Sequence, residues 1–294
     1  MPQTLEAFAT PCVDTIGPFM DALEQARLQS DFDTWCDYTR KSPLLRKWRY
    51  FLSLDPYTRW GLLKPRGYAG DATLMDFAYG HASVQDELAQ AGPLGASIYQ
   101  CTASAPQSAS ARRRIELIAD EIRQHAAQGP LQVASYASGH ARELEQIDPD
   151  TAARIRLFMA IDADERSLVE AARSAGPIAF EGFRRNVIKQ DLSDLPQARL
   201  VYSLGLFDYL NADHGTRVLS HMLAQTAPGG TALLANLAPT AANLGYCEAI
   251  MDWWMIPRSD TDLLTLADAA LQGRPADVGV EQHGCFNYLR VRLR

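Results

Sequence analysis

From residue 131 onward the chain alternates short apolar segments with helical ones, and this alternation limits the possible folds more than any other feature of the sequence. The apolar segments predict strands at 131–136, 156–161, 200–204 and 231–236, with a further strand at 178–183 or near 186–189. Helical spacing fills the gaps at 141–147, 164–174 and 213–225. Strands joined by helices of these lengths pair in parallel. The sequence therefore predicts an α/β fold with a doubly wound, mostly parallel sheet.

The two ends of the chain differ in pattern. Residues 286–293 (FNYLRVRL) alternate apolar and polar side chains, as in a strand at the margin of a sheet. Residues 1–128 instead carry helical spacing and almost no strand signal, and Gly129-Pro130 ends this part. We therefore expect a helical cap or lid domain over 1–128, followed by a Rossmann-like domain over 129–294.

Composition and charge exclude several classes of protein. The 294 residues are 47% hydrophobic and 21% charged, and the formal net charge of −7 disfavours binding to nucleic acid. No apolar run approaches the roughly 18 residues that a membrane span needs, and no secretory leader pattern is present. The five cysteines are scattered, which favours neither disulfides nor a zinc site. We expect a cytoplasmic protein without metal whose partner is a small-molecule substrate; the oligomeric state stays open.

The most informative segment is VASYASGHAREL, residues 133–144, which links a predicted strand to a predicted helix. In an open α/β sheet this is where a ligand binds, and small residues let the backbone approach it closely. A dinucleotide pattern begun at Ala137 would place its third glycine at Arg142, which argues against NAD and FAD. The looser pattern of an S-adenosylmethionine (SAM) site needs small residues at alternate positions, and Ala137, Gly139 and Ala141 supply them. Tight packing alone would explain the turn equally well.

Two acidic residues follow the next predicted strands. Asp162 ends the second strand, where its carboxylate can accept hydrogen bonds from both hydroxyls of a ribose, although strand-end acids also cap helices. Asp191, in Gln190-Asp191-Leu192, follows the third strand, where an acid can meet an adenine amine. A small-residue turn and two acids at successive strand ends together favour a nucleoside ligand.

Five segments in order resemble the motifs of class I SAM-dependent methyltransferases: VASYASGHAREL, AIDADERSL, IKQDLSDLP, VYSLGLFDYL and APGGTALLANLAP. This resemblance covers residues 131–294 and implies a seven-stranded Rossmann-like sheet with SAM as cofactor. RWGLLKPRGYAGDATLMDFAYG (59–80) and MDWWMIPRSDTDLLTLA (251–267) resemble, more narrowly, the bacterial group containing the carboxyl methyltransferase that makes 3-hydroxypalmitate methyl ester.

The resemblance also implies roles for individual residues. Ser135 stands where the family usually has an acid, and Ala137 and Gly139 stand at the glycines that border the methionine part of SAM. Asp162 matches the ribose acid, and Asp191, followed by Leu192, matches the adenine acid. The segment 203–209, with Ser203, Phe207 and Tyr209, matches the region beside the sulfonium, and residues 64–71 resemble a lid element. The family usually has glycine at position 137 and often at 141, whereas this chain has alanine at both.

Several other side chains are candidates for the substrate side of the site. Aromatic faces attract a sulfonium, so Phe207, Tyr209, Tyr68 and Trp253 are candidate walls, with ordinary core packing as the alternative for each. The guanidinium groups of Arg66 and Arg258 are candidate clamps for a substrate carboxylate, or partners of surface acids. Asn236, at the end of the fifth strand, is a candidate for orienting a polar group of the substrate, and Ser203 and Tyr209 complete the candidate catalytic set.

Three functions remain open from the sequence. The first is methyl transfer from SAM to oxygen or nitrogen of a small molecule, most simply a carboxylate, in secondary-metabolite or signal biosynthesis. The second is cyclisation of SAM to azetidine-2-carboxylate and methylthioadenosine, which synthases of the same fold carry out and which the two alanines would suit. The third is a non-catalytic binding protein with a degenerate form of the fold. No Ser-His-Asp or His-Glu-x-x-His pattern supports hydrolysis.

Overall fold

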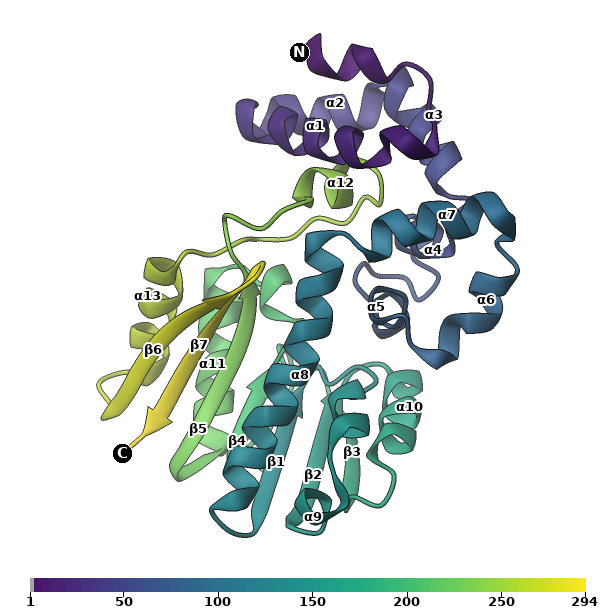
Figure 1. Ribbon diagram of the computed structural model, residues 1–294. Helices are drawn as coiled ribbons and strands as arrows, with labels where there is room; N and C mark the ends of the chain where they lie inside the picture. Colours follow the sequence, from purple (N-terminus) through teal and green to yellow (C-terminus); the bar gives the residue numbers. More distant parts are fainter. Residues whose placement is uncertain (1–2) are drawn as a thin grey trace. The chain divides into compact units, whose positions relative to one another are not determined.

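The structure is a computed structural model that describes residues 3–294, with side chains from Leu5 onward. The chain divides into two compact units (Figure 1). The first contains the residues up to Arg112 and a later segment, Ala241–Trp254; the second contains Arg113–Thr240 and Met255–Arg294. This division differs from the expected boundary near 128, because helix α8 (Pro106–Ala127) lies mostly in the second unit and 241–254 joins the first. Sequence pattern alone does not reveal that a late segment joins an early unit.

The first unit is helical. Its elements are η1 (Gln3–Phe8), η2 (Val13–Thr15), α1 (Ile16–Gln29), α2 (Phe32–Lys41), α3 (Pro43–Leu52), α4 (Pro56–Leu63), α5 (Ala72–Tyr79), η3 (Ala82–Val84), α6 (Gln85–Ala89), α7 (Gly92–Ala103), the start of α8, and α12 (Leu244–Ala249). The side chains of Ser42, Asp55 and Asp71 accept backbone N–H bonds at the starts of α3, α4 and α5. In its core the rings of Phe19 and Trp48 stack with centroids 3.8 Å apart.

The second unit is built on a seven-stranded sheet with the order β3-β2-β1-β4-β5-β7-β6. Its strands are β1 (Leu131–Tyr136), β2 (Ile155–Asp162), β3 (Phe180–Arg184), β4 (Ala198–Ser203), β5 (Thr226–Leu237), β6 (Ala276–His283) and β7 (Phe286–Leu293). The strands from β3 to β5 pair in parallel, while β7 runs antiparallel to both β5 and β6. The prediction of a doubly wound, mostly parallel, Rossmann-like sheet is confirmed.

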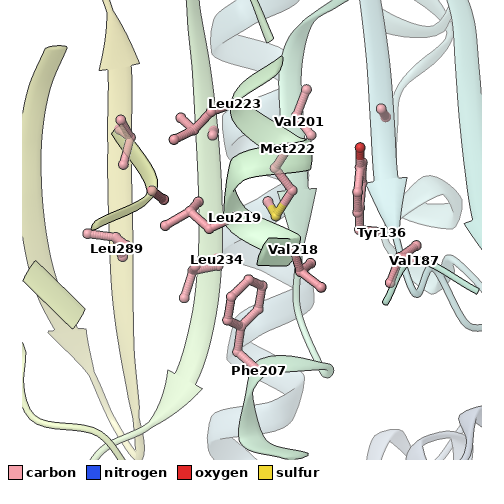
Figure 2. Packing of buried hydrophobic residues seen from close by; sticks show 14 of the residues in the cluster. Tyr136, Val187, Val201, Phe207, Val218, Leu219, Met222, Leu223, Leu234 and Leu289 are labelled. Carbon is pink, nitrogen blue, oxygen red and sulfur yellow. The ribbon is translucent and has the colours of Figure 1, made fainter. Parts of the chain in front are cut away.

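Helices lie on both faces of this sheet. On β7, the side chain of Arg290 forms an ion pair with Glu121 of α8. Its neighbours Leu289 and Val291 point to the opposite face, where they belong to a buried cluster shared with α11 (Ala212–Gln225) and α13 (Asp260–Leu271). Figure 2 shows this cluster, in which side chains of α11 pack against those of the strands on one face of the sheet. Successive residues of β7 therefore face either α8 or the pair α11 and α13.

The predicted elements agree with the structure where apolar runs are strong. β1 and β7 have the predicted bounds, and the third strand falls on the first of its two alternatives, at Phe180–Arg184. The predicted helix at 141–147 is instead the short 3-10 helix η4 (Arg142–Gln146), followed by α9 (Pro149–Ala152). The predicted helix at 164–174 is α10 (Glu165–Ala175). Among the described residues, no helix combines the length and the apolar character needed to cross a membrane.

Candidate functional site

The order of the strands places a candidate ligand site at β1 and β4. From β1 the chain continues to β2 and β3 on one side, and β4 then pairs on the other side of β1. At such a switch point, connections leave the carboxyl ends of neighbouring strands in opposite directions and open a crevice. The two strand ends are joined here because the fully buried hydroxyl of Ser203 donates to the carbonyl oxygen of Tyr136 across 2.9 Å.

The turn after β1 has a left-handed backbone at every second residue. Ala137, Gly139 and Ala141 have φ values of 51°, 55° and 48°. Left-handed geometry costs an L-residue roughly 1–2 kcal/mol, because Cβ crowds the following carbonyl oxygen. The family resemblance implies glycine at position 137 and often at 141, and this conformation gives the physical reason. The alanines keep this backbone path and add a methyl group at each position.

Asp162 connects this turn to the end of β2. One carboxylate oxygen accepts the N–H of Gly139 across 2.8 Å, and the other accepts the N–H of Asp164 across 2.8 Å. Burial raises the pKa of the Asp162 carboxyl, while the two backbone N–H groups and the nearby His140 act in the opposite direction. The structure therefore brings together three of the predicted residues, Ala137, Gly139 and Asp162, at the carboxyl end of the sheet.

The predicted adenine-binding residues lie in the loop between β3 and β4. Asp191 is exposed, and its carboxylate accepts hydrogen bonds from the backbone N–H and the hydroxyl of Ser193 at 3.0 and 2.7 Å. These bonds hold the pKa of the Asp191 carboxyl below its usual value. The side chain of Leu192 is buried in the cluster that contains α11. The adenine contacts of both residues stay predictions, and the side chain of Leu192 is used in core packing.

The segment after β4 contains one core aromatic and one partly exposed aromatic. Figure 2 shows the ring of Phe207 beside Val218 and Leu234, and Phe207 is fully buried in this cluster. The alternative of core packing therefore describes Phe207 better than a ligand wall does. Tyr209 is only partly buried, and its catalytic role stays a prediction.

Arg258 and Asn236 are used inside the fold. The guanidinium of Arg258 is buried and donates to the carbonyl oxygens of Phe207 and Leu210 and, across 2.6 Å, to Oδ1 of Asn236. Asn236 is itself fully buried. These contacts connect the loop after β4 to β5, so both side chains have a structural role, and the substrate contacts of Arg258 and Asn236 stay predictions.

Sequence reasoning missed a buried acid beside this network. Asp208 accepts the N–H of Leu237 across 2.6 Å. Burial raises the pKa of its carboxyl to about 6, and the positive charges of Arg114 and Arg258 limit the rise. The signal available in the sequence was an acid set among apolar residues in GLFDYL, a pattern that is typical of a buried, paired carboxylate.

The remaining candidates belong to the first unit. Arg66 donates to the hydroxyl of Thr73 across 2.8 Å, and Tyr68 is exposed. Trp253 is buried, and its backbone N–H donates to the carbonyl oxygen of Cys247. Their roles in substrate binding stay predictions. Within residues 3–294 no group of three or more His, Cys, Asp or Glu side chains is placed to hold a metal ion.

Comparison with known proteins gives fold-level likeness only. No protein-family model matches the sequence, and no curated protein matches it. A structure from Bordetella parapertussis, described as a possible exported protein, is 20% identical, with a TM-score of 0.56 over 69% of this chain and 73% of that one. A DhpI complex with S-adenosylhomocysteine is 17% identical, with a TM-score of 0.48 over 74% and 94% of the two chains. Magnesium protoporphyrin IX methyltransferase from Synechocystis, also with bound S-adenosylhomocysteine, is 12% identical, with a TM-score of 0.49 over 64% and 84%.

Proposed function

We propose that the second unit binds SAM across the carboxyl ends of β1, β2 and β4, and that the chain is a SAM-dependent transferase acting on a small molecule. One observation carries this proposal: the left-handed turn 137–141 is bound through Gly139 to the carboxylate of Asp162 at the switch point of the sheet. The sequence resemblance to class I methyltransferases, which spans the same unit, supports the same ligand.

The residues at this site fit a nucleoside with a charged tail. Each carboxylate oxygen of Asp162 accepts one backbone N–H and keeps lone-pair capacity for a ribose hydroxyl. Gly139 has no Cβ, so a ligand can approach its backbone closely. The buried hydroxyl oxygen of Ser138 lacks a hydrogen-bond partner among the described residues, and a buried polar atom of this kind is stabilised when a ligand supplies one.

For the reaction we propose methyl transfer to a carboxylate or another oxygen or nitrogen acceptor. When bound, SAM supplies a methyl carbon whose bond to sulfur breaks as the acceptor atom forms its bond, and the electron pair stays on sulfur. A carboxylate acceptor has no proton to lose, so positioning and exclusion of water provide most of the rate. The chain then contributes a rigid turn and a fixed carboxylate rather than a strong base.

Ala137 favours a second candidate, the cyclisation of SAM. Ala137 is partly exposed, and its methyl group lies on the turn where the resemblance expects glycine, so less room is left for an extended methionine tail. In this reaction the α-amine loses a proton and attacks the γ-carbon of the same molecule. The bond from that carbon to sulfur breaks, giving azetidine-2-carboxylate and methylthioadenosine.

Product analysis separates these candidates. The purified protein is incubated with SAM alone and with SAM plus a panel of small carboxylic acids, and the products are identified by mass spectrometry. S-adenosylhomocysteine that forms only with an acid present supports methyl transfer. Methylthioadenosine that forms from SAM alone, above the rate without protein, supports cyclisation. Neither product, from a protein that binds SAM, would contradict both reactions.

A further inference from the structure

A buried carboxyl group lies directly after the left-handed turn, and neither proposed reaction uses it. Glu143, in η4, is 4% exposed, and the hydroxyl of Tyr202 donates to one of its carboxylate oxygens. Burial raises the pKa of Glu143, while the bond from Tyr202 and the charge of Arg114 oppose the rise. An ionised group that is removed from water acts over a longer range than one at the surface, since water screens it less.

Glu143 is also connected to the position where the resemblance expects an acid. Ser135 of β1 pairs in register with Tyr202 of β4, so the two residues are neighbours across the sheet. Both residues face α8, because Tyr136 and Val201 beside them belong to the cluster on the opposite face. Tyr202 is thus both the cross-strand neighbour of Ser135 and the donor to Glu143. A carboxylate is absent at position 135 and present nearby at position 143.

The cationic neighbour of Glu143 is held by other groups as well. Arg114 of α8 donates to the carbonyl oxygen of Leu204 and lies over the ring of Phe286, 4.6 Å from its centroid. The charge of Arg114 also acts on Asp208. Asp208 is also acted on by the buried guanidinium of Arg258, so Glu143 shares its cation with an acid that has a second one.

We propose that Glu143 makes the site prefer SAM over S-adenosylhomocysteine through the negative charge that it holds beside the turn. This inference rests on the proposed function, because it concerns the same ligand. At neutral pH the sulfonium gives SAM one positive charge more than S-adenosylhomocysteine, so a nearby buried carboxylate stabilises the first ligand more than the second. Such a preference lowers the affinity for the product of methyl transfer and eases its release.

The test compares the dissociation constants of SAM and S-adenosylhomocysteine by calorimetry. Glu143→Gln removes the charge and keeps an oxygen that can accept from Tyr202. At a separation of about 10 Å and an effective dielectric constant of about 20, losing one charge weakens SAM binding roughly tenfold. Binding of S-adenosylhomocysteine should change by less than about threefold. The matched control is Glu145→Gln on the same helix, where Glu145 accepts from Arg142 and Ser174; it should leave the ratio of the two constants unchanged.

A second variant keeps the test decisive if the glutamine variant is poorly folded. Ser135→Asp combined with Glu143→Gln places a carboxylate at the position that pairs with Tyr202 in the sheet, and it should restore the preference for SAM. The inference is wrong if Glu143→Gln weakens the binding of both ligands by the same factor, or if the double variant restores stability without restoring the preference for SAM. In either case the proposal that the protein binds SAM still stands. If the unaltered protein binds neither ligand, the proposed function fails instead.

Discussion

Replacing Ala137 by glycine should stabilise the second unit, although it removes a methyl group. The left-handed backbone at φ 51° costs alanine about 1–2 kcal/mol. Glycine removes this cost, but it also gives the unfolded chain more conformational freedom, which lowers the free energy of unfolding by about 0.4–1 kcal/mol. The lost methyl is only partly buried, which costs roughly 0.4 kcal/mol, about half of a buried CH2 group. The net expectation is a stabilisation of about 0.5 kcal/mol.

The matched control removes the same methyl group from an extended backbone. Ala134 lies three residues earlier in β1 and is fully buried. Ala134→Gly should lower the free energy of unfolding by about 0.8 kcal/mol through the lost burial of the methyl group. The flexibility of glycine in a strand should lower it by a further 0.5–1 kcal/mol, roughly. Denaturant unfolding of both variants should therefore show opposite signs and differ by about 2 kcal/mol. If Ala137→Gly destabilises the protein as much as Ala134→Gly does, position 137 is not strained and the reasoning on the turn is refuted.

Two further predictions concern the first unit. Asp55 is fully buried and accepts hydrogen bonds from Thr58 and Thr102, and burial raises the pKa of its carboxyl to about 6 from 3.8. Protonation of Asp55 is thus favoured in the folded state. The stability that this protonation contributes is fully present below about pH 4 and is lost as the pH rises to about 6. Relative to Asp55→Asn, the free energy of unfolding should fall over this range by about 3 kcal/mol at most, at roughly 1.4 kcal/mol per pKa unit; parallel pH profiles would contradict this. Gly245→Ala would place Cβ 2.7 Å from the backbone of α1 and should lower the free energy of unfolding by about 1–3 kcal/mol. The control Gly17→Ala, with nothing within 4 Å of the new Cβ, should leave the free energy of unfolding unchanged or raise it. Equal effects of the two substitutions in thermal melts would refute the close approach at Gly245.

The central strands of the sheet were predictable because their residues are buried on both faces. β1 is a short apolar run, and β7 alternates because one of its faces carries charged side chains such as Arg290. β6 was missed, since its sequence ADVGVEQH is largely exposed at the edge of the sheet and offers little apolar periodicity. Helix α13 begins with the capping box of Ser259 and Asp262, which is a sequence signal for the start of a helix.

The candidate site was predictable only in its backbone-dependent part. Small residues at 137, 139 and 141 indicated a special turn, and the left-handed geometry explains them. Whether a given aromatic or arginine side chain points to a ligand or into the core depends on tertiary packing, which the local sequence does not encode. Phe207 and Arg258 show this, because both are buried among partners more than ten residues away in the chain.

The proximity of Ser135, Tyr202 and Glu143 was also invisible in the sequence. It depends on the pairing of β1 with β4, two strands separated by more than sixty residues. The family resemblance implies an acid at position 135, where this chain has serine. Only the fold shows that the carboxylate of Glu143 accepts a hydrogen bond from Tyr202, the residue that pairs with Ser135.

Calorimetric titration with SAM tests the central claim most directly, on the unaltered protein and on two alanine variants. Asp162→Ala removes the proposed ribose acid, and Asp148→Ala removes a helix cap with two similar hydrogen bonds to Thr151, away from the turn. SAM should bind the unaltered protein and the Asp148→Ala variant with the same affinity. It should bind the Asp162→Ala variant more weakly, by about 1.5–3 kcal/mol for each charge-assisted hydrogen bond lost. Equal affinity in all three proteins would contradict the assignment of Asp162, and no heat of binding to the unaltered protein would contradict the proposed function itself.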